Sequence, residues 1–414
     1  MKKPFYGWAI TGGGALGNVL QGGLIFWSMG IYTSTFEDQF SQPRARITLI
    51  ETFLTVAVNL MSPLIGLWVD KGSARAVVVT GTTALGSGLI LISLAGTLVH
   101  IWLVFALLIP LGALALGVIP STALISRWFR RRRGLALGIS VTGSSIGGAL
   151  APPLLTYLFM AYGWRSALLG TGLAVIALGL VFYRVLVNYP EDVGLEPEPE
   201  ADRISSGAGH SLGQADRWDW SVRQILATPS FWLQTLISGS LLAVTLGLLA
   251  NLSLHAKDLG YVGQQAALLY TTISFCSFFG KIASGGLIDR LGVRVTGWVT
   301  ALALLSGLQC FLWLDGYAGL IGACLLVGIG FGGVTPLWTN MAARGFGARS
   351  VGRTLGVMNP LHIPITAPSA PLAGYISDTT GSYALVFMVY SGLVLVAASA
   401  LVFLRPPRVP DSPG

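Results

Sequence analysis

Charged side chains are scarce in this chain. Aspartate, glutamate, lysine and arginine make up 10% of its 414 residues, whereas an average soluble domain carries about 25%. Apolar residues make up 53%, and the mean hydropathy is +0.71. Because so few polar groups are available to cover a surface in water, lipid must cover much of it. The composition therefore excludes a water-soluble domain and predicts an integral membrane protein.

Other absences narrow the class further. The apolar runs are about 20 residues long and lack the alternating period of barrel strands, which leaves helices as the spanning structure. The three cysteines, Cys276, Cys310 and Cys324, lie inside apolar runs without disulfide or metal-site spacing, so we interpret them as packing residues. The sequence contains no nucleophile motif, phosphate loop or metal-ligand cluster. It thus predicts neither an enzyme nor a bound metal or cofactor.

Apolar runs bounded by charged residues or by Gly/Pro clusters predict twelve transmembrane helices. They lie near residues 8–36, 46–69, 76–97, 101–126, 134–160, 165–187, 229–255, 264–288, 294–313, 317–343, 353–377 and 383–404. If both termini are cytoplasmic, 20 of the 25 lysines and arginines lie in cytoplasmic segments and four lie outside, with Lys281 in a span. This bias predicts cytoplasmic termini and explains the net charge of +8 without a nucleic-acid partner. We expect a multi-pass protein of the cell inner (plasma) membrane.

Residues 188–227 differ from the rest of the chain. They combine prolines and acidic residues with a Ser/Gly-rich stretch. Such a composition cannot bury a core, so we interpret the segment as a cytoplasmic linker. The predicted domains are an N-terminal six-helix bundle (1–187), the linker (188–227), a C-terminal six-helix bundle (228–404) and a tail (405–414).

An internal repeat supports the two halves. The segment from Gly66 to Arg75 follows the second span, and a similar segment from Gly286 to Arg294 follows the eighth. Their aspartates, Asp70 and Asp289, are 219 residues apart. Two halves of the same orientation are typical of parallel repeats about an axis along the membrane normal.

Lys281 is the residue of greatest interest, because it lies inside the predicted span 264–288. An ammonium at hydrocarbon depth is costly unless it faces a wet cavity or a partner. At helical spacing Ser274, Ser277 and Ser284 fall on the same face, and no carboxylate stands three or four residues before the lysine. We therefore predict a polar stripe along a water-filled path, with Lys281 binding a mobile anion between the two halves. Alternatively, Lys281 snorkels to the cytoplasmic surface and anchors the helix.

His362, preceded by Asn359, lies early in the eleventh span between Pro360 and Pro364. Prolines free backbone carbonyls in the binding-site helices of transporters, and imidazole changes its charge near neutral pH. Asn359 and His362 are therefore candidates for substrate binding, and His362 also for proton coupling. The alternative is a histidine that is bonded to neighbouring helices.

Four further residues are candidates for the transport path. Tyr32, Tyr270 and Tyr390 could donate hydrogen bonds to a substrate, although such residues more often serve in packing. Glu51 is the one carboxylate clearly inside a predicted span and is a second candidate for proton coupling. A place in the outer headgroup region explains Glu51 more simply.

The Gly-x-x-x-Asp-Lys/Arg-x-Gly-x-x-Arg type of loop after the second and eighth spans resembles the signature of the major facilitator superfamily. The resemblance implies the twelve-helix, two-bundle fold of that superfamily and secondary transport by alternating access. In the superfamily, the aspartate and basic residues of this loop latch the halves on the cytoplasmic side. The matching positions, which we predict to act in gating, are Asp70, Arg75, Asp289, Arg290 and Arg294.

Within that superfamily, other stretches resemble the monocarboxylate transporter and oxalate:formate antiporter group. They are Tyr6-Gly7-Trp8, the basic turn from Trp128 to Gly138, the segment from His255 to Tyr261, and Phe279-Gly280-Lys281. The group usually has arginine where this chain has Lys281, and lysine keeps the charge but loses the bidentate fork. Proton-coupled animal members have an aspartate one turn earlier, whereas this chain has Ser277, so the resemblance does not imply their charge relay.

Together these features predict a secondary active transporter that moves a small, monocarboxylate-like organic anion by proton symport or anion exchange. We expect a monomer whose partners are the anion, the lipid bilayer and, for symport, protons. One alternative is an exporter of hydrophobic cations or drugs, which would need an acidic residue in its cavity and has Glu51 available. Other anion carriers, such as nitrate or sugar-acid permeases, and a non-transporting membrane sensor are further alternatives.

Overall fold

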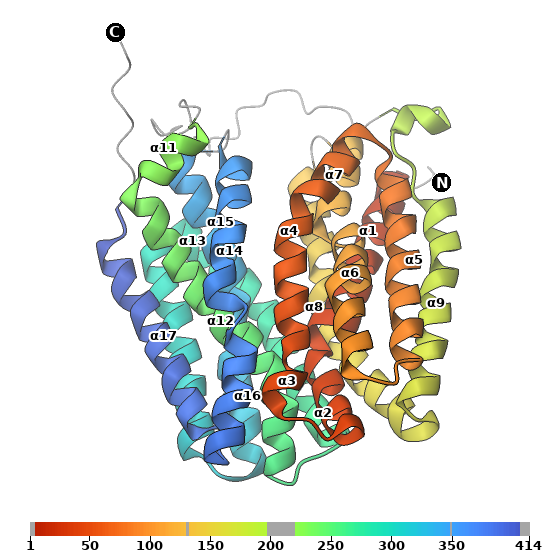
Figure 1. The fold of residues 1–414 in the computed structure, drawn as a ribbon. Helices are drawn as coiled ribbons and strands as arrows, with labels where there is room; N and C mark the ends of the chain where they lie inside the picture. Colours follow the sequence, from red (N-terminus) through yellow and green to blue (C-terminus); the bar gives the residue numbers. More distant parts are fainter. Residues whose placement is uncertain (1–4, 130–131, 197–219, 348–349, 406–414) are drawn as a thin grey trace. The chain divides into compact units, whose positions relative to one another are not determined.

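The structure, a computed structural model, describes residues 5–129, 132–196, 220–347 and 350–405, and all regular structure in these ranges is helical (Figure 1). Before the predicted linker and at its start lie α1 (Gly7–Gln21), the π-helix η1 (Gly22–Trp27), α2 (Met29–Phe40), α3 (Arg44–Ile47), α4 (Leu49–Lys71), α5 (Ala74–Ser93), α6 (Leu98–Leu116), α7 (Val118–Trp128), α8 (Arg133–Tyr162), α9 (Trp164–Val185) and the 3-10 helix η2 (Pro190–Val193). Then follow α11 (Val222–Ala227), α12 (Pro229–Asp258), α13 (Gln264–Trp313), α14 (Gly316–Phe346), α15 (Val351–Thr366), α16 (Ser369–Thr380) and α17 (Ala384–Phe403).

The chain forms two compact units. The first contains Met1–Asp202 and Leu249–Phe275, and the second contains Arg203–Leu248 and Cys276–Gly414. Helices α12 and α13 therefore contribute to both units. The predicted bundles, 1–187 and 228–404, follow chain order, and that division stays a prediction. Residues 197–219 of the predicted linker and 406–414 of the tail lie outside the described residues.

Nine helical stretches of the described residues are long and apolar enough to cross a membrane. One of them, the 50-residue α13, contains two helices that meet at Gly292, whose φ of 84° favours glycine. Two other predicted spans, 8–36 and 353–377, are divided into shorter helices, at η1 and between α15 and α16. The prediction of an all-helical membrane protein is confirmed, while the count of twelve spans and the cytoplasmic termini stay predictions.

Close helix packing in the first unit depends on glycine. Helix α1 packs on α8, and a Cβ added to Gly143 would stand 2.2 Å from the Ala15 carbonyl oxygen. At the start of α1, Tyr6 donates a hydrogen bond to the carbonyl of Val185, the last residue of α9, at 2.8 Å. Helices α2 and α3 lie at the opposite end of this unit (Figure 1). The missing side chain of Gly143 thus lets the backbones of α1 and α8 approach each other closely.

An arginine secures the same loop in each unit. Arg127 Nη2, at the end of α7, donates to the Val69 carbonyl at 3.2 Å in the first unit. Arg344 Nη2, near the end of α14, donates to the Ile288 carbonyl at 3.0 Å in the second. The donors are 217 residues apart and the acceptors 219. This shared contact agrees with the internal repeat seen in the sequence.

Candidate functional site

Helix α13 has two chemically distinct faces around Lys281. Ser274 and Ser277 are fully buried, and Ser284 is 6% exposed. Phe279 and Ile282, which lie outside this stripe, are 52% and 60% exposed. Lys281 itself is half-buried. The polar stripe that the spacing predicts is therefore turned into the protein, while apolar side chains occupy the exposed surface of the helix.

The backbone of this stripe is held against α14 by two glycines. A Cβ added to Gly280 would stand 2.4 Å from the Ile329 carbonyl oxygen, and one added to Gly332 would stand 2.3 Å from that of Ser277. Such contacts leave no room for a side chain on either helix. The Ser277–Lys281 turn is therefore fixed in position by its neighbour within the second unit.

The serines of the stripe differ in how their hydroxyls are used. Ser274 Oγ donates to the Ser145 carbonyl of α8 at 2.7 Å, within the first unit. Ser284 Oγ donates to the Lys281 carbonyl at 3.0 Å. Ser277 Oγ is buried, and no described residue forms a hydrogen bond with it. Because leaving a buried polar group unsatisfied costs about 1–3 kcal/mol, Ser277 is the stripe serine best suited to bind a ligand beside Lys281.

His362 lies in a buried polar cluster of the second unit. It is 3% exposed, and its Nε2 is 2.8 Å from Ser238 Oγ of α12. Ser238 Oγ also lies 2.6 Å from the Gln234 carbonyl, to which it donates, and the imidazole tautomer decides which group donates between Ser238 and His362. The Trp338 ring packs edge-on against the imidazole, with centroids 5.7 Å apart. This geometry matches the alternative of a histidine bonded to its neighbours, and roles in binding and proton coupling stay predictions.

The three candidate tyrosines are buried, and each donates its hydroxyl hydrogen to a backbone carbonyl. Tyr32 donates to Leu24 of η1 at 2.8 Å, Tyr270 to Leu249 at 2.8 Å, and Tyr390 to Ser369 at 3.1 Å. The carbonyls that accept from Tyr32 and Tyr390 lie at helix interruptions, in η1 and at the start of α16. Asn359, on α15, is half-buried. Contact of these four residues with a substrate stays a prediction.

Glu51 is buried in the first unit. It lies in the first turn of α4 and is 2% exposed, and Thr55 Oγ1 donates to its Oε1 at 3.3 Å. The protein thus shields this carboxylate from solvent. An ionised carboxylate is costly to bury. The role of Glu51 in proton coupling stays a prediction.

The predicted gating residues lie at the ends of the helices. In the first unit, the Arg75 guanidinium packs over the Tyr183 ring, 3.9 Å from its centroid; the Asp70 side chain lies outside the described part of the structure. In the second, Asp289 Oδ1 is 3.4 Å from Arg344 Nη2. Arg294 donates to the Leu404 carbonyl, and Arg290 is exposed. Their part in gating stays a prediction.

An ion-pair cluster that joins α2 and the first residue of α3 to the end of α12, within the first unit, was not predicted. It joins five residues: Arg44 Nε is 2.6 Å from Glu37 and Arg44 Nη1 is 2.5 Å from Asp258, while Lys257 Nζ is 2.7 Å from Glu37 and 2.5 Å from Asp38. In sequence these residues look like ordinary interfacial charges. The signal that could have found them is the repeat, because Glu37 and Lys257 lie 220 residues apart at matching ends of equivalent spans.

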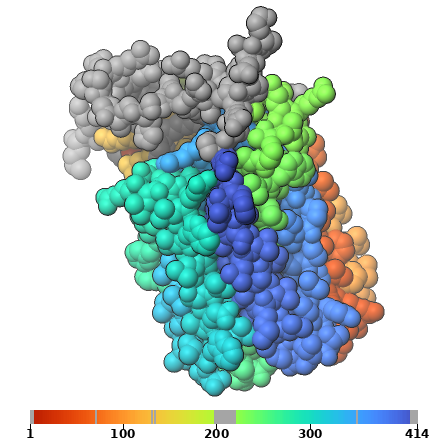
Figure 2. Space-filling model, turned by 90° about the vertical axis from the view of Figure 1, so that its left-hand side faces the viewer, coloured from red at the N-terminus to blue at the C-terminus, as the bar shows by residue number. Residues whose placement is uncertain are grey.

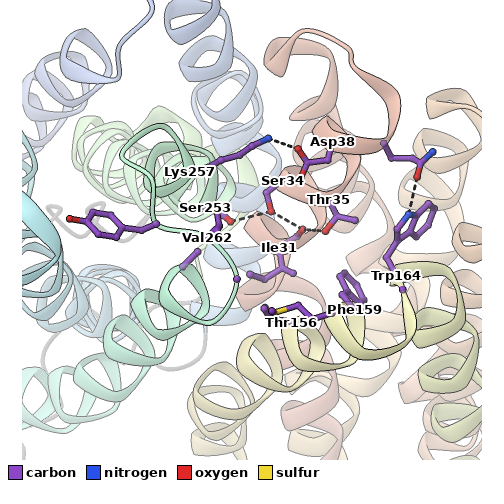
Figure 3. A pocket seen from close by; sticks show the side chains of 16 residues that line it. Ile31, Ser34, Thr35, Asp38, Thr156, Phe159, Trp164, Ser253, Lys257 and Val262 are labelled. Carbon is purple, nitrogen blue, oxygen red and sulfur yellow. Dashed lines mark hydrogen bonds and ion pairs between the residues drawn. The ribbon is translucent and has the colours of Figure 1, made fainter.

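Backbone and hydroxyl contacts continue this junction inward. Thr33 Oγ1 donates to the Ala250 carbonyl at 2.7 Å, and the Ser34 and Ser253 hydroxyls are 3.1 Å apart. A cavity of about 410 Å³ adjoins them (Figure 3). Lys257, Asp38 and Ser34 line one part of it, and Phe159 and Trp164 line another. The Lys257–Asp38 ion pair thus forms part of the wall of an amphipathic cavity.

Comparisons with known proteins agree with this architecture. The family model of the Major Facilitator Superfamily matches residues 14–362. Monocarboxylate transporter 13 of Bos taurus is 28% identical over 404 residues, covering 96% of this chain and 89% of that protein. Monocarboxylate transporter 12 of Mus musculus is 26% identical over 422 residues, covering 97% and 85%. A bacterial homolog of the human lysosomal transporter Spinster, in an inward-facing and occupied conformation, has the same fold, with a TM-score of 0.70 at 16% identity, over 98% of this chain and 95% of that one.

Proposed function

We propose that this chain, which belongs to the major facilitator superfamily, carries a small organic anion of the monocarboxylate type across the membrane by alternating access. It is a multi-pass membrane transporter related to the monocarboxylate transporters, and it is not an enzyme. The relatives over nearly the whole chain favour an anion over a hydrophobic cation as the substrate. We further propose that it acts as a monomer in the plasma membrane.

One observation carries the choice of anion. Lys281 shares the buried face of α13 with Ser277, whose buried hydroxyl has an unused hydrogen bond. A carboxylate that reaches this face would form an ion pair with the ammonium and accept a hydrogen bond from the serine. Lysine is a point charge on a flexible stem, so it can follow differently shaped carboxylates more readily than arginine's planar fork.

Two buried groups are available for proton coupling. Glu51 in the first unit and His362 in the second are both at least 97% buried. Gaining or losing a proton changes the charge of either group in a place where charge is costly. We propose Glu51 as the principal coupling group, because Nε2 of His362 is already engaged with Ser238.

The α2–α12 ion pairs are proposed to close one side of the transport path. The positive-inside bias predicts that this is the outer side, since Arg44 and Lys257 belong to the few basic residues outside. The pairs and the Thr33–Ala250 bond would form when the path is closed there and break when it opens. Substrate would then be exchanged with the cytoplasm while this contact holds.

Counterflow in proteoliposomes tests the proposed function. Vesicles with purified protein are loaded with unlabelled lactate, pyruvate or oxalate, and labelled substrate is added outside. We expect at least one monocarboxylate to accumulate transiently above its external concentration, and a labelled hydrophobic cation not to do so. Protein-free vesicles serve as the control. Accumulation of the cation with none of the carboxylates would contradict the proposal.

A further inference from the structure

A hollow of about 320 Å³ lies at one end of the second unit, among α12, α13, α14 and the residues that follow α17. Three arginines line it: Arg294, Arg344 and Arg405. Gln234 forms part of the buried wall and is 2% exposed. The hollow belongs to neither the Lys281 stripe nor the α2–α12 junction, so its chemistry is separate from substrate binding.

The arginines retain most of their capacity for hydrogen bonds. Arg294 Nη2 donates to the Leu404 carbonyl, and Arg344 Nη2 donates to the Ile288 carbonyl. Among the described residues, Asp289 is the carboxylate that lies within ion-pair distance of one of these arginines. It is 3.4 Å from Arg344, and its side chain is 72% exposed. A guanidinium has five N–H donors, so the hollow presents several donors and an excess of positive charge. These are the features of a site for a phosphate group.

One buried acceptor in the wall of the hollow, the side-chain oxygen of Gln234, receives no hydrogen bond from the described residues. Gln234 Nε2 lies 3.5 Å from Ser230 Oγ, and the Ser230 hydroxyl hydrogen is donated to the Arg405 carbonyl at 2.7 Å. Gln234 Oε1 is buried, and no described residue donates to it. A ligand that satisfies the site should therefore carry a hydroxyl or ammonium donor as well as a phosphate.

The surface beside the hollow is apolar. On α13, Val295 is 42% exposed and Trp298 is 45% exposed; on α17, Phe403 is 68% exposed. The two helices lie side by side on one face (Figure 2), and a Cβ added to Gly297 would stand 2.8 Å from a methyl carbon of Leu401. Arg405 follows directly after the last apolar turn of α17. The hollow is thus bordered by an exposed apolar surface.

We propose that this hollow binds the headgroup of an anionic phospholipid of the phosphatidylglycerol type. The phosphodiester accepts hydrogen bonds from Arg294, Arg344 and Arg405, and a glycerol hydroxyl donates to Gln234 Oε1. The acyl chains lie along the apolar surface of α13 and α17. Basic pockets between transmembrane helices on the cytoplasmic side are general binding places for such headgroups.

Lipid titration of the purified full-length protein in detergent tests this site. Native mass spectrometry counts bound phosphatidylglycerol, and thermal unfolding measures its effect on stability. We expect phosphatidylglycerol to bind and raise the unfolding midpoint, and phosphatidylcholine or inorganic phosphate to do neither. The Arg294→Gln/Arg405→Gln variant should bind phosphatidylglycerol at least about 100-fold more weakly, as two lost charge-assisted hydrogen bonds predict. Gln234→Leu should reduce the preference for phosphatidylglycerol over phosphatidic acid.

The matched control is Arg46→Gln/Arg223→Gln, which removes two exposed arginines that do not line the hollow. Its affinity for phosphatidylglycerol should equal that of the unchanged protein. A lipid-free unfolding midpoint for each variant separates loss of the site from loss of the fold, and Arg294→Lys/Arg405→Lys should restore part of the binding. Equal binding by the glutamine variant and its control would overturn the proposal. So would equal protection by phosphatidylcholine or by inorganic phosphate.

Discussion

Ser277 and Glu51 look ordinary in the sequence, but both side chains are buried in the structure. Burial makes an unsatisfied hydroxyl or a carboxylate a candidate for a functional role. Ser277 is one of three serines on the Lys281 face, yet its neighbours use their hydroxyls for backbone bonds while its own is unsatisfied. Glu51 lies only a few residues from Arg44 and Arg46 and resembles an interfacial acid in the sequence, whereas its side chain is 2% exposed. Periodicity predicted the face of Ser277. It could not predict which hydroxyl lacks a partner, because that depends on α8 and α14.

Replacing Glu51 with glutamine should uncouple transport from protons. The amide keeps the shape and can still accept the Thr55 hydrogen bond, but it cannot take up a proton. We expect Glu51→Gln to retain substrate counterflow and to lose the acceleration of uptake by an inward proton gradient. Uptake into proteoliposomes at equal and unequal pH measures both properties.

His362→Gln is the matched comparison for that experiment. It changes the other buried ionisable candidate, which already contacts Ser238. We expect this variant to keep its response to the proton gradient. If Glu51→Gln keeps the same response as well, the proposed coupling role of Glu51 is wrong.

Helices α2 and α12 meet through charges that the sequence shows only as separate interfacial residues. Side-chain exposure is 13% for Arg44 and 17% for Glu37, so this pair is partly shielded from water. Tyr270 adds a tight contact, since a Cβ on Gly30 of α2 would stand 1.6 Å from its hydroxyl oxygen. The hydroxyl of Tyr270, a candidate substrate-binding residue, thus lies beside α2. The sequence did not predict this contact. Pairing between residues about 220 positions apart is a tertiary property, which hydropathy alone does not contain.

Removing Arg44 should weaken the α2–α12 contact. Arg44→Gln loses its ion pairs with both Glu37 and Asp258, and we expect this to favour the separated arrangement by about 1–2 kcal/mol, roughly a 5–30-fold change in population. Ser253→Cys, in a variant without the three native cysteines, reports the change. Labelling by a membrane-impermeant maleimide should become faster by a similar factor.

The control is Arg46→Gln, two residues away. Arg46 is exposed and donates to Gln42 within its own turn region, so its loss leaves the α2–α12 pairs intact. Its labelling rate should match that of the parent protein that carries only the Ser253→Cys label site. Equal labelling of the Arg44 and Arg46 variants would show that the ion pairs do not hold the contact closed.

For the molecule as a whole, the composition and the motifs were enough to predict the protein class and the family. The low charge and long apolar runs predicted a helical membrane protein, and the repeated aspartate loops predicted the superfamily that the family model matches over residues 14–362. The helix interruptions were harder to predict. The π-helix η1 begins at two adjacent glycines, and α13 turns at Gly292, and both depend on local backbone geometry. Apolar run length does not contain such information.

The central claim is that Lys281 binds the carboxylate of the substrate, and a counterflow series at this position tests it most directly. Lys281→Arg should keep measurable exchange of the carried monocarboxylate. Lys281→Gln should lower it by at least about 30-fold, since losing one partner of a buried charge pair costs about 2–5 kcal/mol. Arg46→Gln, with the same loss of charge at an exposed position, should exchange at the normal rate. Normal exchange by a folded Lys281→Gln protein would contradict the claim.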